Sequence, residues 1–133
     1  MLKTGILNPD LLHLLARIRH TNRLVIADRG FPYWKDLEIV DLSLVDGIPT
    51  VLQVLEAVRV NLDIEQIYMA QEFNLENTPE MKARFAAAMD GIPVTFEAHD
   101  QFKLRVPGSI GLVRTGDTVQ YANLILVSGR VEG

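Results

Sequence analysis

The sequence predicts an α/β fold: a single-domain, three-layer α/β/α arrangement with a mixed, mostly parallel sheet. Short apolar runs of strand length alternate with helical patterns along the chain, which is typical of layered α/β domains. The last two predicted strands, residues 110–114 and 124–127, are joined by a turn-rich segment without a crossover helix. Parallel neighbours need such a crossover, so a purely parallel sheet is disfavoured. The 133 residues fit one domain, which we expect to span residues 1–133.

The first helix is predicted from its start signals. Asn8 can cap it, Pro9 suits the first helical position, and Asp10 complements the positive end of the helix dipole. Apolar residues then recur at helical spacing as far as Ile18, which gives the helix one apolar face. We expect His20 to lie at the end of this helix.

The other elements follow from similar patterns. Residues 50–60 place apolar side chains on one helical face, and Thr78 caps a helix that begins at Pro79 and runs to about Met89. Residues 101–106 are expected to form a helical turn. The predicted strands are residues 24–27, 38–42, 66–70, 92–98, 110–114 and 124–127.

Composition argues against several classes of function. The formal net charge is -4 and no basic tract is present, so nucleic acid is not an expected partner. The absence of cysteine excludes disulfides, thiolate metal sites and thiol nucleophiles. The first residues lack a signal-peptide core, and no apolar run approaches the roughly 20 residues of a membrane span. We therefore expect a soluble cytoplasmic domain without a membrane partner.

Titratable side chains stand where predicted strands begin or end. Asp28 directly follows the first apolar strand, and His99 follows the fourth. In an open α/β sheet, groups just beyond the carboxyl ends of strands line the ligand crevice. His20, before the first strand, can give or take a proton near neutral pH. On local grounds alone, His20 could equally cap its helix, and Asp28 could equally cap the Gly30 loop.

Tyr121 and Asn123 precede the last predicted strand. Their hydroxyl and amide groups suit sugar hydroxyls, although a turn with a core tyrosine is the simpler alternative. Tyr33 and Trp34 could stack on a ligand, and packing against a partner subunit or a loop explains them equally well. The acidic residues interpreted as solvated are Glu56, Asp63, Glu65 and Glu72.

Several catalytic signatures are absent from the sequence. It contains no Gly-rich phosphate loop, no GxSxG elbow and no HExxH motif. The pair His99-Asp100 is similar to the His-Asp pair of metal phosphohydrolases, which need further histidines at matching positions. The chain has three histidines in all, so we expect no metal site.

Six short motifs stand in order along the whole chain. They are Lys3-Thr4-Gly5-Ile6-Leu7-Asn8, Arg19-His20-Thr21, Ala27-Asp28-Arg29-Gly30-Phe31-Pro32, Gly47-Ile48-Pro49 with Gln53-Val54-Leu55, His99-Asp100-Gln101-Phe102-Lys103, and Arg114-Thr115-Gly116 with Tyr121-Ala122-Asn123. Each motif alone is weak, but six in the right order are strong. Together they resemble the D-ribose pyranase and L-fucose mutarotase family, with His99 and residues 121–123 closer to its ribose branch.

The resemblance implies a cofactor-free isomerase that interconverts cyclic forms of a free monosaccharide, with D-ribose as the first expectation. Opening a hemiacetal needs a base for the anomeric hydroxyl and an acid for the ring oxygen, and reclosure reverses the roles. By the matching motif, His20 would be the proton donor. The residues implied to bind the sugar are Asp28, His99, Tyr121 and Asn123, with Ala122 contributing its backbone.

The resemblance also implies a homo-oligomer. Members of the family form rings of subunits, pentamers or decamers, with sites near subunit contacts, so residues 121–123 are expected to serve a neighbour's pocket. Arg29 and Phe31 depart from the ribose pattern, as does the short segment between Phe73 and Ile92, which leaves the sugar open. The alternatives are an L-fucose or other sugar mutarotase and a non-catalytic sugar-binding or regulatory protein.

Overall fold

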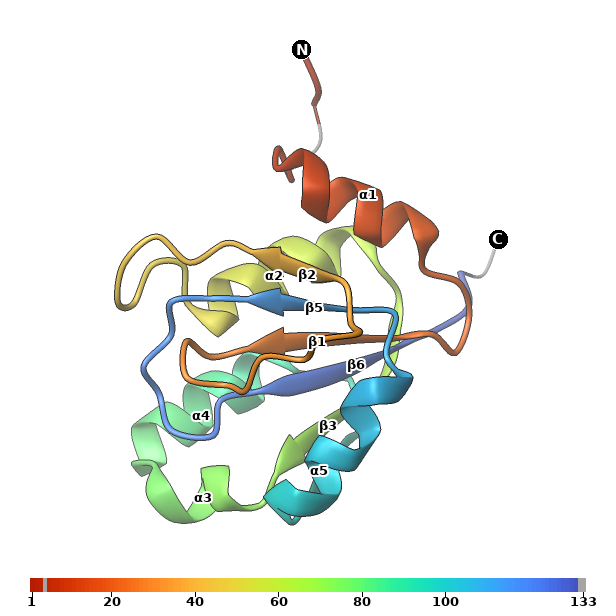
Figure 1. The fold of residues 1–133 in the computed structure, drawn as a ribbon. Coiled ribbons are helices and arrows are strands. Elements are labelled where there is room, and N and C mark those ends of the chain that lie inside the picture. The colour runs from red at the N-terminus through yellow and green to blue at the C-terminus, as the bar shows by residue number, and fades with distance from the viewer. Residues whose placement is uncertain (4, 132–133) are drawn as a thin grey trace.

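The computed structural model describes residues 1–3 and 5–131. Thr4 of the opening motif and the last two residues of the predicted domain lie outside these ranges. Within them, six strands form one sheet in the order β2-β5-β1-β6-β3-β4 (Figure 1). The strands are β1 Arg23–Ala27, β2 Ile39–Asp41, β3 Ile64–Ala70, β4 Val94–Glu97, β5 Gly111–Arg114 and β6 Leu124–Ser128.

The sheet is mixed and mostly parallel, as predicted. β6 runs antiparallel to both of its neighbours, β1 and β3. The pairs β1–β5, β2–β5 and β3–β4 are parallel. The start of β6 therefore lies at the same edge of the sheet as the ends of the other five strands.

Three of the helices begin at, or within one residue of, their predicted starts. The Asn8 side chain accepts the Leu11 N–H at 2.9 Å, and the Thr78 side chain accepts the Met81 N–H at 3.2 Å. Thr50 and Gln53 form a reciprocal capping box. The helices are α1 Pro9–Arg17, α2 Val51–Asn61, α3 Glu72–Glu76, α4 Pro79–Ala88 and α5 His99–Arg105, the last continued by a 3-10 turn at Val106–Gly108.

Side chains on the two faces of the sheet form two cores, which gives the predicted three layers. The larger core joins one face to α1, α2, α3 and α4, and contains the close pair Phe73 and Phe85, whose ring centroids are 4.7 Å apart. The smaller core joins the other face to Phe31, Phe102 and Val106. Figure 1 shows α5 in front of the sheet and α2 behind it. The second face is therefore covered by one short helix and the loop after β1.

Three local predictions differ from the structure, and one of them is the helical turn expected at residues 101–106, which forms as helix α5 from His99 to Arg105. The first helix ends at Arg17, and Ile18 is already extended, so the prediction that His20 lies at the helix end is wrong. The chain has to leave the helix early because it turns sharply at Thr21, whose φ is +72°, before it enters β1. Helix α3 was not predicted, since it is short and has no side-chain cap. Tertiary packing of Phe73 stabilises it instead.

At Gly116, the segment before β6 packs closely against the backbone of the loop before α2, and a substitution there can test this packing. A Cβ at Gly116 would overlap the carbonyl oxygen of Val45 and lie 2.7 Å from that of Ile48. We expect Gly116→Ala to destabilise the fold by about 1–3 kcal/mol in urea unfolding, because backbone cannot yield as a side chain does. Gly108→Ala is the matched control, since its Cβ would meet nothing within 4 Å. Equal stabilities of the two variants would contradict this close packing.

Candidate active site

Four of the residues predicted to bind the sugar meet in one pocket. Asp28 follows β1, His99 begins α5 directly after β4, and Tyr121 and Asn123 precede β6. The reversed direction of β6 brings all of them to one edge of the sheet. The pocket has a volume of about 270 Å³ and is lined by Asp28, Gly30, Phe31, Pro32, His99, Gln120, Tyr121 and Asn123. Tyr121 and Asn123 thus line the pocket of their own chain, whereas the family resemblance led us to expect that they would serve a neighbour's pocket.

Asp28 is held from two directions. Its carboxylate Oδ1 accepts the Gly30 N–H at 2.9 Å. Its own backbone N–H donates to Oδ1 of Asn123 at 2.7 Å, which joins the end of β1 to the start of β6. Burial raises the pKa of Asp28, and the hydrogen bonds from Gly30, Asn123 and Phe31 oppose that rise. The result is a carboxyl group that takes up a proton more readily than a solvated one.

His99 is fixed by backbone and ring contacts. Its N–H donates to both carboxylate oxygens of Glu72 at 3.1 Å. The imidazole meets Tyr121 and Phe31 edge-on, at centroid distances of 5.1 and 6.2 Å, and stacks on Phe102 at 6.0 Å. Burial lowers the pKa of His99, which favours the neutral ring. Its Nδ1 is buried and has no hydrogen-bond partner within the described residues.

Three residues of the segment 120–123 line the pocket, and Ala122 is the exception. Tyr121 has φ of +55°, in the left-handed region, and the preceding Gln120 carbonyl accepts the Asn77 side-chain amide at 2.8 Å. Asn123 is almost fully buried and reaches β1. The Ala122 side chain is fully buried in the larger core and does not line the pocket. That the Ala122 backbone binds a sugar, as the family resemblance implies, stays a prediction.

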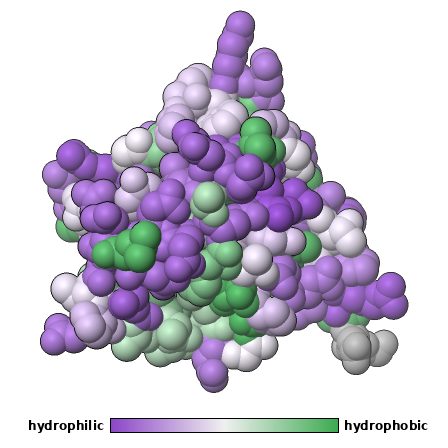
Figure 2. Space-filling model, turned by 90° about the horizontal axis from the view of Figure 1, so that it is seen from below, coloured by the Kyte–Doolittle hydropathy of each residue, from purple (hydrophilic) through white to green (hydrophobic). Residues whose placement is uncertain are grey.

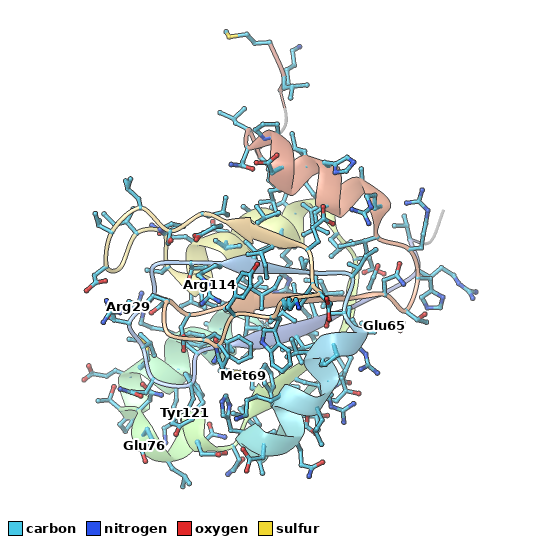
Figure 3. All side chains as sticks on the ribbon, in the orientation of Figure 1. Arg29, Glu65, Met69, Glu76, Arg114 and Tyr121 are labelled. Carbon is cyan, nitrogen blue, oxygen red and sulfur yellow. The ribbon has the colours of Figure 1, made fainter. Side chains whose placement is uncertain are left out.

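His20 lies at the opposite edge of the sheet. It stands in the turn before β1, whereas Asp28 follows β1, and the strand between them spans about 16 Å. Its Nε2 is 3.4 Å from a carboxylate oxygen of Glu65, and both side chains are nearly half exposed. Figure 3 shows Glu65 on the far side of the sheet from Arg29 and Tyr121. The pocket of one chain therefore does not contain His20.

The sequence interpretation missed two residues that support the pocket. Glu72 was interpreted as solvated, yet it binds the N–H of His99. Arg114 donates to the carbonyl oxygens of Asp28 and Pro32 at 3.1 and 3.3 Å. Both act on backbone atoms, so a sequence pattern carries little signal for them. The presence of Arg114 in a matching motif was the one available hint.

Tyr33 and Trp34 do not line the pocket. Tyr33 is exposed, and Trp34 packs on Phe31 at a centroid distance of 6.4 Å. Beside Trp34 lies a shallow, mainly apolar cavity of about 480 Å³ that includes Leu104 of α5. The face that carries α3 and α5, seen from below in Figure 2, is mostly hydrophilic, with one larger hydrophobic area below the centre of the view and smaller hydrophobic spots elsewhere. Trp34 thus packs against the loop after β1 from outside the pocket, whereas Tyr33 faces solvent.

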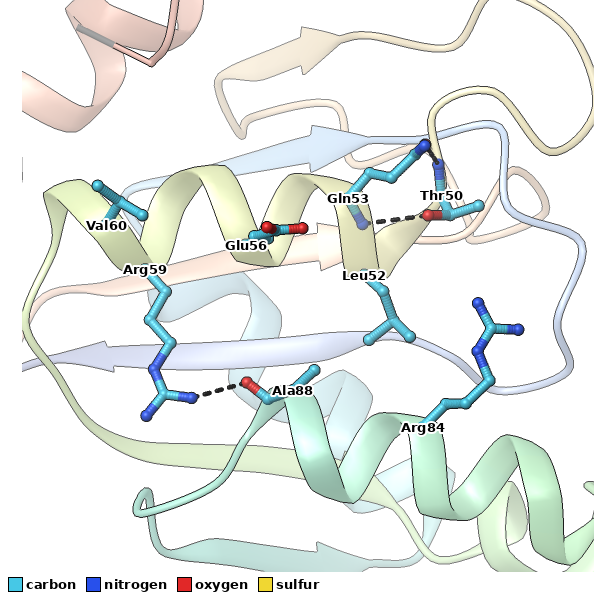
Figure 4. Close-up of a pocket in the computed structure, with 8 residues that line it drawn as sticks. All are labelled: Thr50, Leu52, Gln53, Glu56, Arg59, Val60, Arg84 and Ala88. Atoms are coloured by element: carbon cyan, nitrogen blue, oxygen red, sulfur yellow. Dashed lines mark hydrogen bonds between the residues drawn. The ribbon is translucent and has the colours of Figure 1, made fainter.

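A larger cavity of about 700 Å³ lies elsewhere, between α2 and α4 (Figure 4). Several of its polar groups already make structural hydrogen bonds. Thr50 and Gln53 cap α2, and Arg59 donates to the Ala88 carbonyl at 2.8 Å. We place the candidate active site in the smaller pocket, because a carboxyl, an imidazole and a phenol converge there.

Two further features bear on the alternatives. Across residues 1–3 and 5–131, no group of three or more His, Asp or Glu side chains is placed to hold a metal ion. No helix in the same ranges is long and apolar enough to cross a membrane.

Comparison with known proteins gives consistent matches over nearly the whole chain. A D-ribose pyranase of Geobacillus kaustophilus (strain HTA426) is 45% identical over 129 residues, which are 97% of this chain and 94% of the relative. A D-ribose pyranase of Geobacillus thermodenitrificans (strain NG80-2) is 41% identical over 129 residues, 97% of each chain.

Solved structures agree with these relatives. The structure of Bacillus subtilis RbsD complexed with D-ribose matches with a TM-score of 0.91 and 32% identity, covering 99% of this chain and 100% of that one. The fucose mutarotase from Streptococcus pneumoniae in complex with L-fucose has a TM-score of 0.78 at 21% identity and covers 94% of each chain, so it shares the fold. The model of the RbsD / FucU transport protein family matches residues 1–131. The chain therefore belongs to the RbsD / FucU family, as its six motifs indicated.

Proposed function

We propose that this protein is an isomerase that interconverts the cyclic forms of free D-ribose by acid/base chemistry of its own side chains. The observation that carries the proposal is the pocket that joins Asp28, His99, Tyr121 and Asn123 in a chain 45% identical to a D-ribose pyranase. Its volume of about 270 Å³ suits a small ligand such as a monosaccharide. The pocket groups comprise acceptors and donors for several hydroxyls.

Ring opening requires two proton transfers. A base takes the proton of the anomeric hydroxyl, the bond from the anomeric carbon to the ring oxygen breaks, and an acid protonates that oxygen. The open-chain aldehyde then recloses through a different hydroxyl, or on its other face, with the roles reversed. Burial raises the pKa of Asp28 toward neutrality, so this carboxyl can exchange a proton more readily. Burial lowers the pKa of His99, which keeps the imidazole neutral and able to accept a proton. Asp28, His99, Tyr121 and Asn123 bind the sugar hydroxyls, and Ala122 offers its backbone.

The proton donor is His20, which reaches the pocket from a second copy of the chain. Its exposed imidazole at the opposite edge of the sheet supports this arrangement, since such a side chain is available to a neighbour. Each subunit of a ring, a pentamer or a decamer, would then lend His20 to one adjacent pocket. The protein acts in the cytoplasm on free monosaccharide.

The first experiment is NMR exchange spectroscopy on D-ribose at equilibrium. We expect wild-type protein to accelerate exchange between pyranose and furanose forms, and His20→Ala to reduce this acceleration by about 100-fold or more. His13→Ala is the matched control, because His13 is exposed on α1 and should leave the rate unchanged. Acceleration for L-fucose alone would favour a fucose mutarotase. Sugar binding without any acceleration would leave a binding protein.

The second experiment tests whether His20 of one subunit completes the pocket of another subunit. His20→Ala and Asp28→Asn chains, each nearly inactive alone, are co-expressed with different tags and purified as mixed oligomers. Random mixing should restore about a quarter of the wild-type rate, because intact sites form where one variant supplies His20 and the other Asp28. Mixed oligomers as inactive as the separate variants would contradict a site shared between copies.

Asp28 should also lower stability at neutral pH. Because its folded pKa lies above the ordinary value of 3.8, the wild type loses stability as the pH rises from that value through the raised pKa. Asp28→Asn lacks this penalty, so it should be more stable than wild type in urea at pH 7 and lose that advantage near pH 3.5. Asp100→Asn, at an exposed carboxylate, is the control and should show no such pH-dependent gain. A gain from Asp28→Asn that is the same at both pH values would contradict the raised pKa.

A further inference from the structure

Arg114 holds the loop that follows β1. It ends β5, directly opposite Ala27 of β1. Its Nη1 donates to the carbonyl oxygens of Asp28 at 3.1 Å and Arg29 at 3.4 Å, and its Nη2 donates to that of Pro32 at 3.3 Å. Among the described residues, Arg114 makes no ion pair. Its guanidinium therefore acts on backbone carbonyls and not on a carboxylate.

One of these carbonyls belongs to the peptide unit that binds Asp28. The Arg29 carbonyl and the Gly30 N–H are the two polar ends of a single peptide group, and in a planar trans peptide they point in opposite directions. The carbonyl end faces Arg114, and the N–H end donates to Oδ1 of Asp28 at 2.9 Å. Fixing the carbonyl thus fixes the direction of the N–H that holds the carboxylate.

We infer that Arg114 is a positioning residue, which aims the Asp28 carboxylate into the pocket by clamping the Arg29–Gly30 peptide and the loop as far as Pro32. The inference rests on the proposed function only in that Asp28 is taken to meet the sugar. Arg114 itself does not line the pocket, so its effect passes through Asp28.

The clamp depends on the shape of the arginine side chain. A planar guanidinium presents several N–H donors in fixed directions and can reach three carbonyls at once. A lysine at this position keeps the positive charge but offers one compact ammonium group, which cannot hold the three carbonyls in the same arrangement. Arg114→Lys therefore separates the geometry of the clamp from its charge.

Loss of the clamp has a defined effect on Asp28. The N–H groups of Gly30 and Phe31 lower its pKa, so a released loop should let the pKa rise further. Other charged or titratable groups around the carboxyl are Asp117, whose negative charge raises the pKa, and His99 and Tyr121 across the pocket. None of these is altered by a substitution at position 114.

The test is a carbon-13 NMR titration of protein labelled at aspartate carboxyl carbons, with the Asp28 signal assigned by its absence in Asp28→Asn. We expect Arg114→Lys to raise the pKa of Asp28 by about one unit. Arg114→Gln should raise it at least as far. Arg29→Gln is the matched control from the same loop, because Arg29 pairs with Asp46 on the surface, and it should leave the pKa unchanged. The titration needs no activity, so it is independent of the outcome with D-ribose.

Exchange kinetics provide the second readout. In Arg114→Lys, the fall of the D-ribose exchange rate at acid pH should begin about one unit higher than in wild type, in line with the titration. If Arg114→Lys titrates like wild type, the geometry of the clamp does not set the pKa of Asp28, and the inference is overturned. If, in addition, Arg114→Gln alone shifts that pKa, the charge of Arg114 is what matters. An equal shift in Arg29→Gln would overturn it as well.

Discussion

β6 lies near the centre of the sheet, between β1 and β3, and runs opposite to both. This direction brings the start of β6 to the edge where β1 and β4 end, so residues 121–123 meet Asp28 and His99 there. The bond from the Asp28 N–H to the Asn123 side chain joins the two strands at this point. With β6 in the other direction, Tyr121 would lie at the edge that carries His20.

The sequence predicted most elements because their signals are local. Asn8, Thr50 and Thr78 bond to the first turns of their own helices, and the strands are short apolar runs that end at polar residues. Helix α3 could not be predicted, because its stability comes from a partner more than ten residues away in the chain. The site was predicted in part: the strand-end residues came together, whereas His20 is separated from them by the length of β1. The local sequence around His20 does not show at which edge of the sheet its turn lies.

Burial acts on the two ionisable side chains of the pocket in opposite directions, since it disfavours the charged form of each. The carboxyl becomes a weaker acid and the imidazole a weaker base. The protein limits this effect on Asp28 with N–H donors from its own loop, while the Nδ1 of His99 is left without a partner in the described structure. The rings of Phe31, Phe102 and Tyr121 surround the imidazole and restrict how it can turn.

Ala122 separates two side chains that point into or toward the pocket, and its methyl group is enclosed by the larger core. A larger residue at position 122 would displace Tyr121 and Asn123 together, so these two side chains cannot change position independently. The opposite rim is built from Gly30, Phe31 and Pro32, and it is held as well, since Phe31 is buried in the smaller core and Arg114 binds the Pro32 carbonyl. Neither wall of the pocket can therefore shift alone, and a change in the shape of the pocket requires compensating changes in the core behind that wall.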